Sequence, residues 1–107
     1  MQQLSPQQLH AWLTDNSRTP PLLLDVREPW EYQIAHLTDS QLIPMHSVPE
    51  HMQTLDKLAP VVVICHHGVR SMHIARLLAH HQFTDLYNLS GGIDAWAHRV
   101  DLEMAVY

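Results

Sequence analysis

The sequence predicts an α/β domain with a mostly parallel sheet, and three observations favour this fold class. Short apolar runs alternate along the chain with stretches of helical periodicity, which is the order of elements in such folds. The run Val61–Ile64 is apolar at every position, which is typical of a central strand buried on both faces. The chain has 107 residues, enough for one domain with its own core but not for two. We therefore expect a single domain over residues 1–107.

The first half of the chain begins with clear helix-start signals. Ser5 can cap a helix, Pro6 suits its first position, and Gln8 completes a capping box. A pair of prolines then separates this helix from an apolar run that has the character of a strand. We predict, in order, a helix that begins at Pro6, a strand at 22–26, a short helix at 29–35, a brief strand at 41–43 and a third helix capped by Ser47.

The second half contains a strand, a loop and a helix in direct succession. The strand Val61–Ile64 runs into Cys65, and a helical pattern over about residues 71–81 follows the loop. The other predicted features are an exposed face on that helix (His73, Arg76 and His80), a last strand at 86–89, a turn at Gly91–Gly92 that leads into a short helix, and an unassigned segment at 100–107.

The composition excludes several function classes. Hydrophobic residues make up 46% of the chain and charged residues 16%, as in globular rather than disordered proteins. Six Lys plus Arg give no basic surface for nucleic acid, and the net charge is −5. No apolar stretch is long enough to cross a membrane. The single cysteine and the lack of a secretory signal at residues 1–4 favour a reducing compartment, so we expect a cytoplasmic protein.

Cys65 is the residue that we expect to carry the chemistry. Backbone N–H groups of the following loop and the positive end of the next helix would surround its sulfur, and such surroundings favour the nucleophilic thiolate. Gly68 permits a tight loop, and Arg70 adds a fixed positive charge with a planar set of donors. The predicted site is the catalytic Cys65 with the substrate-binding residues His66, His67, Gly68, Val69 and Arg70.

A second group of residues is expected to support this site. In open α/β sheets, ligands bind beyond the carboxyl ends of the strands. Asp25 ends the strand at 22–26 as Cys65 ends the strand at 61–64, so both are expected at one edge. Arg27 lies four residues before Glu31, a spacing that favours a local ion pair. We predict that Asp25, Arg27 and Ser71 are structural supports of the site.

Four segments of the chain, in the right order and spacing, resemble the rhodanese (sulfurtransferase) domain family. The resemblance covers nearly the whole chain, and its most specific part is the loop Cys65–Ser71. The four segments are Leu24-Asp25-Val26-Arg27 with Glu31-Tyr32, His36-Leu37 leading towards Pro44, the loop Cys65-His66-His67-Gly68-Val69-Arg70-Ser71, and Leu89-Ser90-Gly91-Gly92-Ile93-Asp94-Ala95-Trp96.

The resemblance implies a fold and a mechanism. The fold is a three-layer α/β/α arrangement with a five-stranded parallel sheet and helices on both faces. In the implied mechanism the Cys65 thiolate takes the outer sulfur from a donor, holds it as a persulfide and passes it to an acceptor. The donor is a small anion such as thiosulfate or a persulfide, including one on a protein. The acceptor is cyanide in the test tube and a thiol or a protein in the cell.

Three alternatives stay open. Cysteine-loop phosphatases and arsenate reductases place five residues between cysteine and arginine, whereas only four, His66 to Val69, separate Cys65 from Arg70 here. This shorter loop suits a sulfur atom better than a phosphoryl group. A non-catalytic rhodanese-like interaction module typically lacks the cysteine. A sulfur carrier that takes persulfide only from a partner protein cannot be separated by sequence from a thiosulfate enzyme.

Ten histidines raise the question of a metal site. Cys65, His66 and His67 are adjacent, but adjacent loop residues rarely point at the same ion. No spacing typical of structural zinc ligands occurs either. We therefore predict no metal site and no cofactor.

Overall fold

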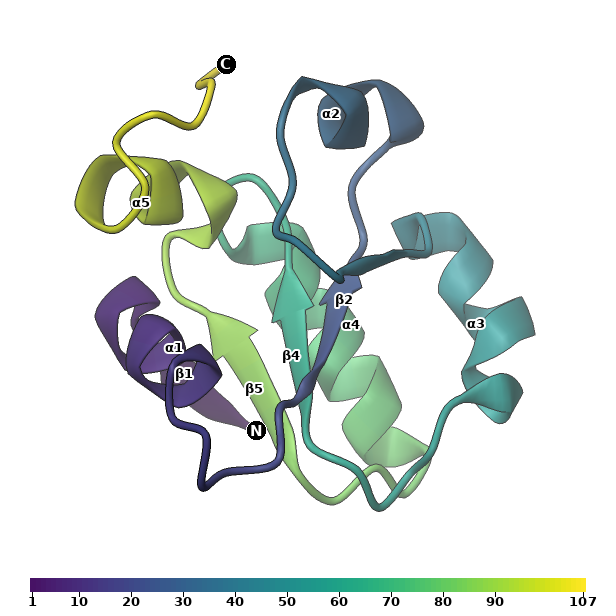
Figure 1. The fold of residues 1–107 in the computed structure, drawn as a ribbon. Helices are drawn as coiled ribbons and strands as arrows, with labels where there is room; N and C mark the ends of the chain where they lie inside the picture. The colour runs from purple at the N-terminus through teal and green to yellow at the C-terminus, as the bar shows by residue number, and fades with distance from the viewer.

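The computed structural model describes the whole chain, Met1–Tyr107, as an α/β fold around a five-stranded parallel sheet (Figure 1). The strand order is β1-β5-β4-β2-β3. The strands are β1 Gln2–Leu4, β2 Leu22–Asp25, β3 Gln41–Leu42, β4 Val61–Ile64 and β5 Leu86–Leu89. The helices are α1 Pro6–Leu13, α2 Pro29–Ile34, α3 Val48–His51, α4 Val69–His80 and α5 Gly92–Arg99, with 3₁₀ turns at Met45–Ser47 and Met52–Thr54 on either side of α3.

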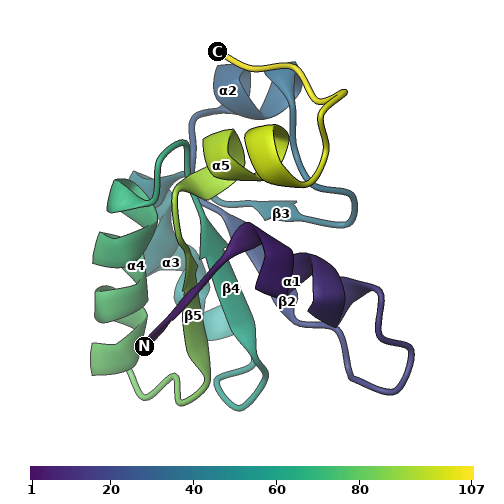
Figure 2. The ribbon, with the colours of Figure 1, turned by 90° about the vertical axis from the view of Figure 1, so that its left-hand side faces the viewer.

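The sheet is covered on both faces, which confirms the three-layer fold. Figure 2 shows α3 and α4 on one side of the strands and α1 and α5 on the other. Val61 and Val63 belong to the apolar cluster beneath α3 and α4. Val62 and Ile64 belong to the cluster beneath α1 and α5. All four side chains are fully buried, as expected for the central strand of a parallel sheet.

The first strand, β1, was not predicted from the sequence. Its three residues pair in parallel with Tyr87–Leu89 at the edge of the sheet. Two of the three are exposed glutamines, so the segment has neither an apolar run nor a clear alternation to mark it. The strand completes the five that the family resemblance implied.

The boundaries of several predicted elements differ by one or two residues. The capping box of α1 is confirmed, because Gln8 N–H donates to Ser5 Oγ at 3.1 Å and Ser5 N–H donates to Gln8 Oε1 at 2.9 Å. Ser47 is the N-cap residue of α3 as predicted, but its side chain makes no capping hydrogen bond. Helix α4 begins at Val69 rather than at Ser71, and its predicted exposed face is confirmed. None of the helices has the length and apolar character to span a membrane.

Candidate functional site

The site lies beyond the carboxyl end of β4, where the chain turns from a buried strand into helix α4. Cys65 follows the strand directly, and only 1% of its surface is exposed. Its Sγ atom receives the Gly68 N–H at 3.1 Å and lies 3.2 Å from Ser71 Oγ. The predicted succession of strand, loop and helix is therefore present, and the loop curls around the sulfur.

Helix α5 holds the other side of this loop. The N–H groups of Ile93 and Asp94 donate to the carbonyl oxygens of Cys65 and His66, at 2.9 and 3.0 Å. A Cβ atom on Gly92 would collide with these two carbonyl groups, so the close approach requires glycine. These two hydrogen bonds hold the loop against α5. The Gly91–Gly92 turn leads into α5 as predicted, and it also packs against the loop.

Arg70 is paired with a carboxylate that the sequence did not place in the site. Its Nη1 and Nη2 atoms donate to the two oxygens of Glu31 at 2.7 and 2.8 Å. The Glu31 carboxylate also accepts the Glu28 N–H at 2.9 Å and the Tyr107 hydroxyl at 3.0 Å. The hydrogen bonds from Arg70, ahead of the other contacts, lower the pKa of Glu31 to about 2, and the same pairing raises the pKa of Arg70. The positive charge expected beside the loop is thus largely balanced.

Asp25 and Arg27 form a fully buried ion pair at the end of β2. Arg27 Nη2 lies 2.7 Å from Asp25 Oδ2, and Arg27 Nε donates to Oδ1 at 2.9 Å. The other Arg27 donors reach the backbone oxygens of Glu31 and Ala35 and the Tyr107 hydroxyl. The predicted ion pair between the Arg27 and Glu31 side chains is therefore wrong. Asp25 lies nearer, and its buried charge needs a partner.

The two loop histidines have different surroundings. The His66 ring stacks on Tyr107 with 3.9 Å between centroids and a 10° interplanar angle. Its buried Nε2 has no hydrogen-bond partner, and burial lowers the pKa of His66, which favours the neutral ring. The His67 side chain is 62% exposed, and its Nδ1 lies 3.8 Å from Asp94 Oδ2.

One cluster near the site has metal-ligand chemistry. His66, His67 and Asp94 each offer a ligand atom, and these atoms lie within 4.8 Å of one another. This grouping could not be predicted from the sequence, because Asp94 comes from a different element. Asp94 lies in the first turn of α5, where a carboxylate is favoured by the helix dipole, and the contact with His67 needs no ion.

Three residues in the site were not predicted there: Glu31, Asn88 and Tyr107. Asn88 is 1% exposed and accepts a hydrogen bond from the Ser71 hydroxyl. A lone amide between apolar residues of a strand is the sequence signal that would have marked it. Tyr107 comes from the unassigned segment at 100–107, which crosses beside α2 beyond the strand ends (Figure 2). No local pattern indicated that contact.

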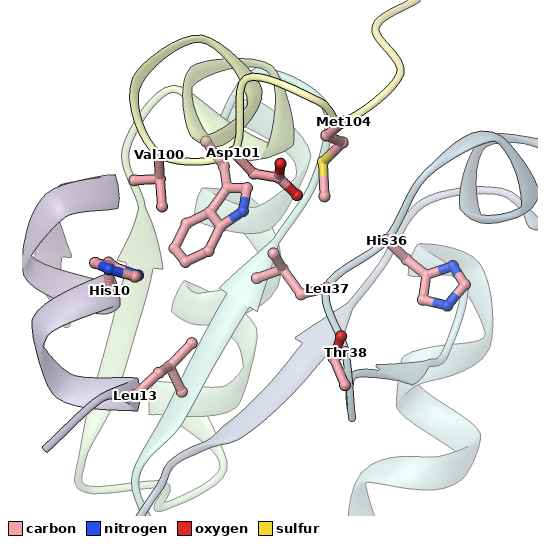
Figure 3. Close-up of a pocket in the computed structure, with 9 residues that line it drawn as sticks. His10, Leu13, His36, Leu37, Thr38, Val100, Asp101 and Met104 are labelled. Atoms are coloured by element: carbon pink, nitrogen blue, oxygen red, sulfur yellow. The ribbon is translucent and has the colours of Figure 1, made fainter.

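A pocket also lies away from the Cys65 loop. It has a volume of about 380 Å³ and opens between α1, α5 and the segment after α2 (Figure 3). No residue of the Cys65 loop lines it, so it is separate from the predicted site. Its lining residues are His10, Leu13, His36, Leu37, Thr38, Trp96, Val100, Asp101 and Met104.

The Glu31 contacts predict acid sensitivity. Because the folded-state pKa of Glu31, about 2, lies below its ordinary 4.5, these contacts contribute stability that is fully present above about pH 4.5 and is lost as the pH falls through 2. We expect that contribution to be of the order of 3 kcal/mol. Urea unfolding of the wild type and Glu31→Gln between pH 6 and 2 measures it. The gap between the two curves should close towards pH 2, and parallel curves would contradict this role.

Comparisons with known proteins identify the family and agree with the fold. The family described as "Rhodanese-like domain" matches residues 5–99. The thiosulfate sulfurtransferase GlpE of Pseudomonas fluorescens is 34% identical over 84 residues, which are 78% of this chain and 77% of that protein. GlpE of Pseudomonas aeruginosa is 33% identical over 89% of this chain and 83% of its own length. A rhodanese-like domain protein from Staphylococcus aureus superposes with a TM-score of 0.84 at 25% identity, over 100% of this chain and 99% of that one.

Proposed function

This chain belongs to the rhodanese-like domain family, and on that premise we propose that it transfers sulfane sulfur through a persulfide on Cys65. The observation that carries the proposal is the environment of the only cysteine. Its sulfur receives the Gly68 N–H and lies beside the Ser71 hydroxyl, while the Cys65 and His66 carbonyls accept hydrogen bonds from α5. A backbone N–H directed at a sulfur atom suits a sulfur that carries negative charge.

The first half-reaction loads Cys65. The thiolate attacks the outer sulfur of the donor, a new S–S bond forms, and the S–S bond of the donor breaks. Thiosulfate leaves as sulfite, whereas a persulfide donor leaves as its thiol. The electron pair of the broken bond leaves with that group, so no external oxidant or reductant is needed. The Gly68 N–H can donate to sulfur both before and after the step.

The second half-reaction unloads the persulfide. An acceptor nucleophile attacks its outer sulfur, and the Cys65 thiolate is released for the next cycle. Cyanide gives thiocyanate, and a thiol gives a new persulfide. One cysteine suffices because the second nucleophile comes from the acceptor.

The donor class that we propose is a small anion, thiosulfate or a persulfide, and the partners that we propose in the cell are protein donors and acceptors of sulfur. The relatives named thiosulfate sulfurtransferases support thiosulfate. His67 is an exposed residue of the loop and can attract an anion when protonated. Val69 is 61% exposed at the start of α4 and offers an apolar contact. Thiols stay reduced in the cytoplasm, where we propose that the protein acts.

Parallel assays of two reactions test this function. We expect the protein to form thiocyanate from thiosulfate and cyanide and to release no phosphate from an aryl phosphate. The loop has four residues between Cys65 and Arg70, which favours the sulfur reaction over the phosphoryl reaction. A low-molecular-weight persulfide serves as the second donor. Phosphate release without thiocyanate would overturn the proposal, and inactivity with both sulfur donors would favour a binding module.

A further inference from the structure

Asn88 connects the two groups that contact the Cys65 sulfur. It lies in β5, the strand beside β4, and its side chain is buried. Its Nδ2 group donates to the Gly68 carbonyl oxygen at 3.2 Å and to Gln3 Oε1 at 3.0 Å. With both Nδ2 hydrogens donated, the remaining amide atom, Oδ1, is the one that faces Ser71.

The Ser71 hydroxyl has only one hydrogen to share between two neighbours. Asn88 Oδ1 can only accept, so the hydroxyl hydrogen is donated to Asn88. The Ser71 oxygen then has only lone pairs to offer to the sulfur, 3.2 Å away. In this arrangement a Cys65 thiol donates its S–H to Ser71.

A negatively charged sulfur needs hydrogen-bond donors around it, whereas a thiol needs an acceptor for its S–H. A thiolate or persulfide anion has no hydrogen to donate and is stabilised by donors. The Gly68 N–H already donates to it. Ser71 becomes a second donor only if its hydroxyl turns from Asn88 to the sulfur. That turn leaves the buried Oδ1 of Asn88 without its donor, which is unfavourable.

We propose that Asn88 is a positioning residue that sets the direction of the Ser71 hydroxyl and thereby limits how readily the Cys65 sulfur becomes negatively charged. This inference rests on the proposed role of Cys65 as the sulfur-carrying nucleophile. Asn88 acts only through Ser71 and Gly68 and does not touch the sulfur itself. Asn88 also donates to the Gly68 carbonyl oxygen. This contact helps to hold in place the residue whose N–H donates to the Cys65 sulfur.

The pH dependence of cysteine alkylation tests the proposal without requiring sulfur transfer. Iodoacetamide is a neutral reagent that reacts with the thiolate, and Cys65 is the only cysteine in the chain. Asn88→Leu has a similar shape but cannot accept from Ser71, so the freed hydroxyl can donate to the sulfur. We expect the pH at half-maximal alkylation rate to fall by about one unit.

Two further variants distinguish this role from a nonspecific effect of the substitution on the packing of the protein. Ser71→Ala removes the hydroxyl, so adding Asn88→Leu to it should leave the profile unmoved, although both changes loosen packing. Gln3→Ala removes an exposed partner of Asn88 and spares Ser71, so it should retain the wild-type profile. An unmoved profile in folded Asn88→Leu, or an equal shift in the Ser71→Ala background, would overturn the proposal. Neither result would contradict the proposed sulfurtransferase function, because thiocyanate formation tests that function separately.

A spectroscopic measurement keeps the proposal testable if Asn88→Leu does not fold. The single cysteine gives a single S–H stretching band, recorded at a pH where the thiol is protonated. A thiol that donates to Ser71 has a weakened S–H bond, so the wild-type band should lie at lower frequency than the Ser71→Ala band. Identical band positions would show that the thiol does not donate to Ser71 and would overturn the proposal.

Discussion

Replacing Cys65 with alanine is expected to reduce thiocyanate formation from thiosulfate and cyanide to the uncatalysed rate while the domain stays folded. The reaction depends on one sulfur nucleophile, and the chain contains no second cysteine to take its place. The side chain is buried, so the loss of its sulfur atom should destabilise the fold by about 1 kcal/mol. The rate is measured by thiocyanate formation, and the stability by urea unfolding.

Cys65→Ser is the matched variant for this test. Its hydroxyl is smaller and far less nucleophilic, but it can keep hydrogen bonds to Gly68 and Ser71. Both variants should therefore be inactive, and the serine variant should retain more of the wild-type stability. Thiocyanate formation that survives in either folded variant would exclude a Cys65 persulfide.

Substitutions of Glu31 and Arg70 are expected to change the affinity for anionic sulfur donors. Glu31 holds both terminal nitrogens of Arg70 and balances its charge. Glu31→Gln removes the negative charge, so we expect the KM for thiosulfate to fall by up to about tenfold. Arg70→Ala should raise the KM by a similar factor, because the remaining Glu31 carboxylate repels the donor. Steady-state kinetics that report KM and kcat separately measure both changes.

High salt is the control for this interpretation. An effect of charge on donor binding weakens as salt screens it, whereas an effect of altered packing does not. Arg70→Lys keeps the positive charge but not the paired donors, so its KM should lie between those of the wild type and Arg70→Ala. If Glu31→Gln and Arg70→Ala moved the KM in the same direction, the charge balance described here would not govern donor binding.

The centre of the site could be predicted because its signals are local. The apolar run of β4, the glycine in the loop and the helical pattern of α4 are consecutive, and each specifies its own segment of structure. Gly68 illustrates this, since its φ of +97° is the left-handed conformation that the tight loop requires. A short run of sequence was therefore enough to place Cys65 at the end of a central strand.

The partners of the charged side chains could not be predicted in the same way. The rule for residues four apart pairs Arg27 with Glu31, but the structure pairs Glu31 with Arg70, which is 39 residues away. That choice depends on where α2 sits relative to α4, and no local pattern specifies it. Tyr107 bridges Arg27 and Glu31 for the same reason: the final segment is brought over the strand ends by tertiary structure.

An intact-mass measurement of the purified protein, before and after incubation with thiosulfate, tests the central claim most directly. Cys65→Ala is treated in parallel. We expect that the wild type gains the mass of one sulfur atom, that cyanide removes it, and that the variant gains nothing. A protein that turns over sulfur donors without any added mass on Cys65, or an equal gain on Cys65→Ala, would contradict a persulfide at this residue.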